Sequence, residues 1–257
     1  MTREIRSLAL IGASGQMGGL FAAGARDAGM DVRPLGRPLT PDRVSAAVRG
    51  VDLVLLSVPI NRMNATLDAV VPEMDQETIL ADLCSVKVQP LKQMLEAHRG
   101  PVVGTHPLFG PVLPEGFEPR VAVVRGRGDG AAEAVTAFFR RLGHAPFDCT
   151  AEEHDRALSV IQGLNFTTTV AYLAVLREVD PDRRFLTPSL RRRLDSARKM
   201  LTEDRELFGV IAESNPFSQE AVRRFRTFLS LAAGGDLDLL ADQAGWWWRG
   251  TMEAGRE

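Results

Sequence analysis

Short apolar runs alternate with helical patterns along the first 150 residues of this 257-residue chain. Seven runs predict strands, at residues 7–12, 31–35, 52–58, 78–83, 102–106, 121–126 and 145–148, the last after a helix at about 130–142. Several runs are apolar along their whole length, which is typical of parallel strands covered by helices on both faces. The pattern therefore predicts an α/β fold built from βαβ units.

The strand pattern stops after Thr150, and the remaining chain has helical periodicity. We expect helices at about 151–178, 188–201, 203–213, 216–233 and 236–252. Thr187 and Asn215, each followed by proline, are the expected N-caps of two of them. The change predicts two domains, residues 1–150 and an all-helical domain at 151–257. The first of these helices is apolar on more than one side, so we expect a homodimer through the C-terminal helices.

Composition narrows the classes of partner. The formal net charge is −2 and the sequence pI is about 6.1, so a field that attracts nucleic acid or an anionic membrane is not expected. No apolar run approaches the roughly 18 residues of a membrane span, and the first strand begins without a basic, apolar leader. Cys84 and Cys149 lack the spacing of a disulfide or a metal site. These features predict a cytoplasmic protein with two reduced thiols, no metal and a small-molecule partner.

A glycine-rich loop follows the first predicted strand and opens a helix. Gly12, Gly15 and Gly18 have the spacing G-x-x-G-x-x-G, a variant of the dinucleotide fingerprint G-x-G-x-x-G in which Ala13 stands where the first glycine would be. Such a loop needs a tight turn, a bare backbone for the pyrophosphate and close helix-to-strand packing. This context predicts an N-terminal Rossmann dinucleotide-binding domain. The expected cofactor contacts are Gly12, Ser14, Gly15, Gln16, Met17, Gly18, Gly36, Arg37, Ser57, Val58 and Pro59.

The end of the second strand bears on which dinucleotide binds. In NAD-preferring sites an acid at this place bonds the adenosine ribose hydroxyls, but here Gly36 and Arg37 follow the strand and no acid is present. A guanidinium without a carboxylate suits a 2′-phosphate. The predicted cofactor is therefore NAD(P), with NADP slightly favoured over NAD.

Three further segments make the chain resemble the prephenate dehydrogenase family. They are DLCSVK at 82–87, GTHPLFGP at 104–111 and EEHDRALSVIQGL at 152–164, and with the glycine loop the similarity covers nearly the whole chain. The resemblance implies an enzyme that oxidises a cyclohexadienyl acid at the carbon carrying the ring hydroxyl. Hydride passes to NAD(P), the ring carboxylate leaves as carbon dioxide, and the ring becomes aromatic.

The resemblance also implies roles for individual residues. His106 corresponds to the family's catalytic histidine, and a neutral imidazole can accept the hydroxyl proton as hydride leaves. Ser85 would orient that histidine or the substrate hydroxyl, and Lys87 would add positive charge near a dianionic substrate. A capped helix start is the alternative for Ser85 and Lys87. Gly104 and Gly110 are expected to leave room for the substrate ring.

The other histidines have plainer predicted roles. His154 lies in the first turn of the long helix, where we expect it to cap or pack. His98 and His144 are expected to face solvent.

Two departures from the family pattern concern the substrate. Phe166 stands where the family usually has a second histidine, and Pro216 where it has an arginine that binds a substrate carboxylate. Neither side chain donates a hydrogen bond, and Asn165 offers a neutral contact instead. We therefore hypothesise that the substrate is prephenate or its ring-amino analogue, 4-amino-4-deoxyprephenate. The candidates to replace the arginine are Arg191, Arg192, Arg193, Arg198 and Lys199.

Two other functions stay open. One is a dehydrogenase or reductase of the six-phosphogluconate-like group that does not decarboxylate, although the long helix has no lysine of the kind those enzymes use. The other is a dinucleotide-binding sensor without catalysis, which needs neither His106 nor Ser85.

Overall fold

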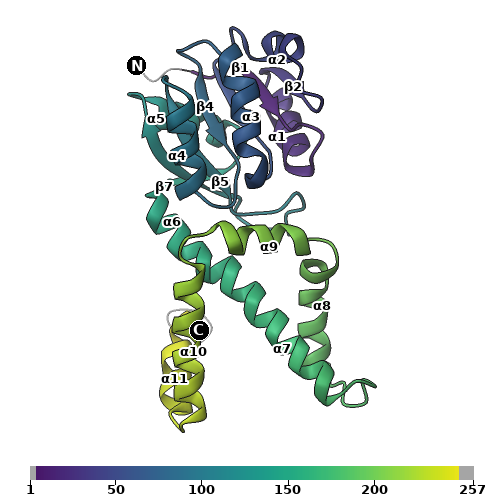
Figure 1. The fold of residues 1–257 in the computed structure, drawn as a ribbon. Coiled ribbons are helices and arrows are strands. Elements are labelled where there is room, and N and C mark those ends of the chain that lie inside the picture. The colour runs from purple at the N-terminus through teal and green to yellow at the C-terminus, as the bar shows by residue number, and fades with distance from the viewer. Residues whose placement is uncertain (1–3, 249–257) are drawn as a thin grey trace, which may run out of the picture.

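The structure is a computed structural model that describes residues 4–248. Its core is a seven-stranded sheet in the order β2-β1-β3-β4-β5-β6-β7, which confirms the predicted α/β fold (Figure 1). The strands are β1 (Ser7–Ile11), β2 (Asp31–Leu35), β3 (Leu53–Leu56), β4 (Ile79–Asp82), β5 (Val102–Pro107), β6 (Arg120–Arg127) and β7 (Ala145–Asp148). Every predicted strand is present.

Strand direction departs from the expected parallel pattern at one edge of the sheet. The strands β1 to β5 are parallel, but β6 pairs antiparallel with β5, and β7 is parallel to β6. The connection across residues 108–119 contains no helix. Antiparallel neighbours need no helical crossover, so a loop suffices to return the chain alongside β5.

Helices cover both faces of this sheet and divide its core in two. They are α1 (Gln16–Asp27), α2 (Pro41–Val48), α3 (Met63–Val70), α4 (Val88–Ala97) and α5 (Ala131–Arg141). One apolar cluster joins the sheet to α1 and α5, with Phe21 and Phe139 among its buried members. The other joins it to α2, α3 and α4, with Val44 and Met94 buried. The long apolar strands are therefore buried on both sides.

The helical part starts where the sheet ends. The helices α6 (Ala151–Leu158) and α7 (Asn165–Val179) are continuous through a π-helical turn at Ser159–Leu164. They are followed by α8 (Pro188–Thr202), α9 (Arg205–Ser214), α10 (Ser218–Ala233), α11 (Leu237–Ala244) and a 3-10 turn at Gly245–Trp248. The first four predicted ranges agree to within two residues at each end, but the last, expected over 236–252, ends as an α-helix at Ala244; residues 249–252 lie outside the described residues.

The local caps explain where these helices begin. The Thr150 hydroxyl accepts from the Glu153 N–H at 3.1 Å while the Glu153 carboxylate accepts from the Thr150 N–H at 2.8 Å, a complete capping box. Thr187 caps α8 as predicted. Asn215 instead accepts from the Phe217 N–H, so α10 begins at Ser218, two residues later than expected.

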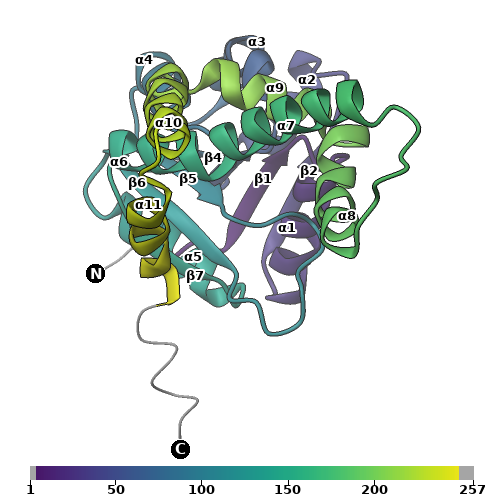
Figure 2. The ribbon, with the colours of Figure 1, turned by 90° about the horizontal axis from the view of Figure 1, so that it is seen from below.

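The helices form two arms below the sheet (Figures 1 and 2). The long α6–α7 helix runs away from the sheet, α8 returns, and α9 lies beneath the carboxyl edge, while α10 and α11 form the second arm. Burial is sparse here: α7 buries only Thr169, and α11 buries none of its residues. The helix Ala151–Val179 has a mean hydropathy of 1.3 in its most apolar window, of which 22% is buried, so by length and composition alone it is apolar enough to span a membrane. One such helix is weak evidence for a span, and an uncovered contact face has the same composition.

Candidate active site

The glycine loop turns sharply between β1 and α1. Gly12 has φ +89°, and a Cβ there would lie 2.1 Å from the Ser57 carbonyl oxygen. A Cβ on Gly18 would lie 2.3 Å from the Gly12 carbonyl oxygen. Both positions therefore need glycine, because neighbouring backbone occupies the space of any side chain.

The start of α1 fits a phosphate group. Gly15 is the N-cap, it provides no side-chain cap, and the first turn of α1 has no acidic residue. The first N–H groups of the helix are therefore open to an anion at the positive end of the helix dipole. The predicted contacts Ser14, Gln16 and Met17 lie in this turn, which fits the pyrophosphate of a dinucleotide.

The segment after β2 lies beside this loop. The Gly12 N–H donates to the Leu35 carbonyl at 2.8 Å, and a Cβ on Gly36 would lie 3.3 Å from the Ser14 hydroxyl oxygen. Arg37 is exposed, and the Arg43 guanidinium of α2 donates to the Pro38 carbonyl. Two guanidinium groups therefore border the end of β2.

The segment after β3 closes the other side of the loop. Ser57 donates its N–H to the Ile11 carbonyl at 2.8 Å. Ser57 and Val58 are half-buried and Pro59 is exposed, and the Ser57 backbone and the Val58 side chain lie against Gly12. The glycine loop and the ends of β2 and β3 are thus brought together at the carboxyl edge of the sheet, where such folds bind their ligands.

His106 lies on β5 and its ring contacts the start of α6. The side chain is 4% exposed, and its Nδ1 lies 2.9 Å from Nε2 of His154, which is also 4% exposed. Nδ1 of His154 lies 2.7 Å from Oδ1 of Asp155. The expectation that His154 only caps or packs is therefore wrong: Thr150 caps the helix, and His154 is hydrogen-bonded to the candidate base.

Burial and charge keep His106 neutral. Its pKa lies well below the ordinary histidine value because the ring is desolvated, and the nearby His154 and Lys87 further oppose a positive charge. The other ring nitrogen, Nε2, has no hydrogen bond to any residue that the structure describes, and it is not sealed inside the protein. It is therefore open to a ligand, and it is an acceptor when Nδ1 carries the hydrogen of the neutral ring.

Lys87 does not face a substrate. Its side chain is fully buried, and its ammonium donates to Asp82 at 2.5 Å and to the Thr105 carbonyl at 2.6 Å. Its stem fills the space over Gly104, whose Cβ would lie 3.4 Å from Lys87 Cδ. The predicted substrate contact at Lys87 and the predicted space at Gly104 are therefore both wrong, because the cation is neutralised beneath the strands.

Asp82 organises this buried charge at the end of β4. Its carboxylate also accepts the N–H groups of Cys84 at 3.0 Å and Thr105 at 3.1 Å, while the Thr105 hydroxyl donates to the Asp82 carbonyl. We missed Asp82 and Asp155 in the sequence. An acid ending a wholly apolar strand was the available signal for Asp82, since a buried carboxylate needs a partner.

The remaining predicted site residues are spread around His106. Ser85 is half-buried in the turn before α4, and no hydrogen bond within residues 4–248 joins it to His106. Gly110 has open space at its Cβ position, as expected. Asn165 is exposed, and the Phe166 ring stacks on Phe208 of α9 with centroids 5.6 Å apart.

Two other histidines differ from prediction. His98 is 3% exposed, not solvent-facing, and its Nε2 lies 2.9 Å from the Thr78 carbonyl. His144 is half-buried against the rings of Phe21 and Phe109. Burial lowers the pKa of both.

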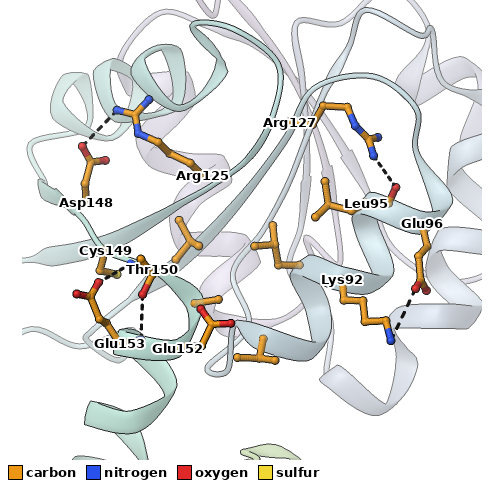
Figure 3. A pocket seen from close by; sticks show the side chains of 14 residues that line it. Lys92, Leu95, Glu96, Arg125, Arg127, Asp148, Cys149, Thr150, Glu152 and Glu153 are labelled. Atoms are coloured by element: carbon orange, nitrogen blue, oxygen red, sulfur yellow. Dashed lines mark hydrogen bonds and ion pairs between the residues drawn. The ribbon is translucent and has the colours of Figure 1, made fainter.

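A surface hollow of about 850 Å³ lies away from these residues, between α4, β6 and the turn into α6 (Figure 3). Its charged side chains pair with protein groups, as in Lys92–Glu96, Arg125–Asp148 and Arg127 with the Leu95 carbonyl. Neither His106 nor the glycine loop lines it.

The sequence is similar to a family model and to curated proteins. Residues 35–118 match the model of the prephenate dehydrogenase nucleotide-binding domain. The T-protein of Enterobacter agglomerans is 30% identical over 226 residues, which cover 86% of this chain and 60% of that protein. Across four curated relatives, the matched part is 44% to 60% of the relative's length.

Solved structures share the fold. The arogenate dehydrogenase of Synechocystis has a TM-score of 0.76 at 16% identity, covering 96% of this chain and 99% of that one. The prephenate dehydrogenase of Aquifex aeolicus, in complex with hydroxyphenyl propionate and NAD+, has a TM-score of 0.67 at 18% identity, covering 99% and 100%.

Proposed function

Because this chain belongs to the prephenate dehydrogenase family, we propose that it catalyses the NAD(P)-dependent oxidative decarboxylation of a prephenate-type cyclohexadienyl acid to an aromatic 2-oxo acid. The observation that carries the proposal is the environment of His106. Its ring is held neutral at the carboxyl end of β5, with Nε2 free, at the edge where the glycine loop opens.

The residues of the site account for the proton movements. When the substrate is prephenate, His106 accepts the proton of the ring hydroxyl while the hydrogen on the same carbon leaves as hydride. A bound nicotinamide supplies the acceptor for that hydride. The electron pair of the ring–carboxylate bond then enters the ring as carbon dioxide departs, and His106 returns its proton to the resulting phenolate. No net proton is consumed, so the base is restored in each turnover.

Replacing His106 tests the function directly. We expect His106→Asn to lower kcat by at least roughly 100-fold while the cofactor affinity, measured by fluorescence titration, is kept. The matched control is His98→Asn, which alters a buried histidine at the far end of α4. Unchanged turnover in His106→Asn would refute the base. Carbon dioxide release coupled to cofactor reduction separates this function from a non-decarboxylating dehydrogenase and from a sensor.

The cofactor preference is a finer part of the proposal. Arg37 and Arg43 border the end of β2, where no acid stands to bind ribose hydroxyls. A 2′-phosphate between two guanidinium groups would make charge-assisted hydrogen bonds. NADPH should therefore bind more tightly than NADH, and Arg37→Ala should remove most of the difference; equal affinities in the wild-type protein would contradict this.

The substrate amino group is a second fine point. Phe166 is engaged in a stack with Phe208, Pro216 is exposed, and neither can donate a hydrogen bond to a substrate carboxylate or hydroxyl. This favours 4-amino-4-deoxyprephenate over prephenate, with Asn165 as a neutral contact. Comparison of kcat/KM for the two compounds decides, and a clear preference for prephenate overturns the amino analogue.

The proposed assembly is a homodimer through the C-terminal helices, acting in the cytoplasm. Large apolar side chains on these helices are exposed, including Val175 at 60%, Leu229 at 54% and Leu237 at 61%. Patches of this kind mark interaction surfaces in soluble proteins. Val175 lies on α7 in one arm, and Leu229 and Leu237 lie on α10 and α11 in the other (Figure 1).

A further inference from the structure

A chain of hydrogen bonds leads from the candidate base into the helical part. Nδ1 of His106 meets Nε2 of His154 at 2.9 Å, and Nδ1 of His154 meets Oδ1 of Asp155 at 2.7 Å. The Asp155 carboxylate also accepts the N–H groups of Lys87 at 2.7 Å and Val88 at 2.9 Å. These two N–H groups belong to the start of α4, so the carboxylate occupies the N-terminus of that helix.

When both imidazoles are neutral, the donors and acceptors in this chain have one consistent order. A carboxylate only accepts, so the hydrogen between His154 and Asp155 is on Nδ1 of His154. The neutral His154 then has a bare Nε2, which accepts. Nδ1 of His106 must therefore carry the hydrogen that it donates to His154. A neutral His106 is left with a bare Nε2, the nitrogen that a base needs toward its substrate.

We propose that His154 and Asp155 are positioning residues that hold His106 as the Nδ1–H tautomer and share the proton it takes from the substrate. The inference rests on the proposed function, and it adds two residues to which the family resemblance gave no catalytic part. When Nε2 of His106 takes the hydroxyl proton, its Nδ1–H bond to His154 becomes charge-assisted. Transfer of that second proton to Nε2 of His154 places the positive charge beside the Asp155 carboxylate.

Burial makes this sharing useful. Both imidazoles are nearly inaccessible to water, and the charged groups around them are Asp155 on α6, the Lys87 ammonium at the start of α4 and Asp82 on β4. Lys87 is neutralised by Asp82, which leaves Asp155 as the carboxylate available to the imidazole pair. A proton that must return to the product oxygen is thus held within the site until the carboxylate has left.

The same aspartate ties the two parts of the chain together. Its side chain caps α4 of the sheet part, and its carbonyl accepts from the Asn215 amide at 2.7 Å, just before α10. Asp155→Asn would therefore disturb packing as well as the relay. His154 has no such second role, so it is the residue to change.

The tautomer can be read in the wild-type protein without any substrate. Long-range ¹H–¹⁵N NMR of protein labelled in its four histidines distinguishes a protonated Nδ1 from a protonated Nε2. The resonances absent from His106→Asn identify His106. We expect Nδ1–H and a bare Nε2 at neutral pH. A protonated Nε2 on neutral His106 overturns the relay, whatever the turnover of the enzyme.

Kinetics of two His154 variants separate positioning from packing. His154→Gln keeps an acceptor for the His106 Nδ1–H but cannot take the proton, whereas His154→Phe removes both. We expect kcat to fall roughly 10-fold in His154→Gln and roughly 100-fold in His154→Phe, with KM within about 3-fold of wild type. Thermal melting and cofactor titration confirm that both variants are folded.

The outcomes keep the two proposals apart. If His106→Asn loses turnover but both His154 variants keep the wild-type kcat, the relay is wrong and the base stands. If His106→Asn keeps turnover, the proposed function is wrong, and the NMR result still decides the tautomer. A rise in KM alone in the His154 variants would mean a packing role.

Discussion

The sheet part, residues 4–148, and the helical part, residues 151–248, differ in how far they bury their apolar residues. Every residue of β3 is buried, and so is every residue of β4, including the paired Asp82. In the helical part α10 buries only Ala221 and α11 buries none. The first part closes on itself, whereas the second leaves its apolar faces uncovered.

The comparison distinguishes apolar surface that one chain buries by itself from apolar surface that stays exposed on the single chain. In the sheet part each apolar strand faces helices of the same chain, and even its buried cation has an anion. In the helical part many large apolar side chains stay exposed on the single chain, among them Val175 and Leu237. Because large exposed apolar patches are uncommon in monomers, these side chains are the basis of the proposed homodimer.

Disrupting the buried Lys87–Asp82 ion pair of the sheet part should have the largest effect on stability. Lys87→Met removes the cation from a pair in which both side chains are fully buried. The uncompensated Asp82 carboxylate should cost about 3 to 5 kcal/mol in the free energy of unfolding, measured by urea denaturation.

The double variant Lys87→Met with Asp82→Asn is the control. It removes both charges of the pair and should recover part of the lost stability. If Lys87→Met instead keeps its stability and raises the KM for the substrate, Lys87 serves the substrate, as the family resemblance implied.

The glycine loop gives the next largest effect. Gly12→Ala strains a backbone at φ +89° and brings Cβ within 2.1 Å of the Ser57 carbonyl oxygen. We expect a loss of at least about 2 kcal/mol and weaker cofactor binding.

Gly50→Ala is the matched control for that loop. Gly50 has φ +69° but no atom within 4 Å of its Cβ position, so the variant has the backbone strain alone. It should lose about 1 kcal/mol and bind cofactor normally. Equal losses in the two variants would mean that the close approach to Ser57 has no energetic role.

The same contrast explains how much the sequence could predict. The strands were found because continuous apolar runs are a local signal, and the glycine loop because its spacing is local. The antiparallel direction of β6 could not be predicted, because the residues that follow a strand look similar whether a loop or a helical crossover comes next. Lys87 was assigned to the substrate because nothing local indicates that its ammonium meets Asp82 five residues earlier, under Thr105.

His154 was misjudged for a related reason. Its partner His106 lies 48 residues away along the chain, and only the fold brings the rings together. The adjacent acid was visible in the sequence, but an acid in the first turn of a helix has an ordinary explanation in the helix dipole. Local patterns thus predicted the elements and the family resemblance implied the candidate base, whereas the contact between His106 and His154 required the tertiary structure.

A single charged substitution tests the exposed apolar surface of the helical part. Leu229→Asp places a carboxylate on α10, where the side chain is 54% exposed. The dimer dissociation constant should rise at least about tenfold, because each copy loses apolar contact at the interface. Size-exclusion chromatography with light scattering measures the change.

Val112→Asp is the control on the sheet part. Val112 is 85% exposed in the loop after β5, so both the dimer and the stability of this variant should match wild type. A wild-type protein that stays monomeric at all concentrations, or a Leu229→Asp dimer of unchanged affinity, would contradict the proposed interface.

The smallest expected effect is a change in the pH dependence of the thermal stability, through His144 of the sheet part. Burial lowers the pKa of His144, whose Nδ1 has no hydrogen-bond partner among residues 4–248 and whose ring packs between Phe21 and Phe109. In the unfolded chain this imidazole has a pKa of about 6.5. Above that pH the ring is neutral in both states and has no effect on the pH dependence of the free energy of unfolding. Below it the unfolded chain binds a proton that the folded protein does not, so the stability falls by at most about 1.4 kcal/mol per pH unit. His144→Phe keeps the ring contacts and removes the proton site. Melting temperatures of this variant should fall less than those of wild type between about pH 7 and pH 5, while His98 and His106 still titrate in both proteins; parallel curves would show that His144 is not one of the groups that couple acid to unfolding.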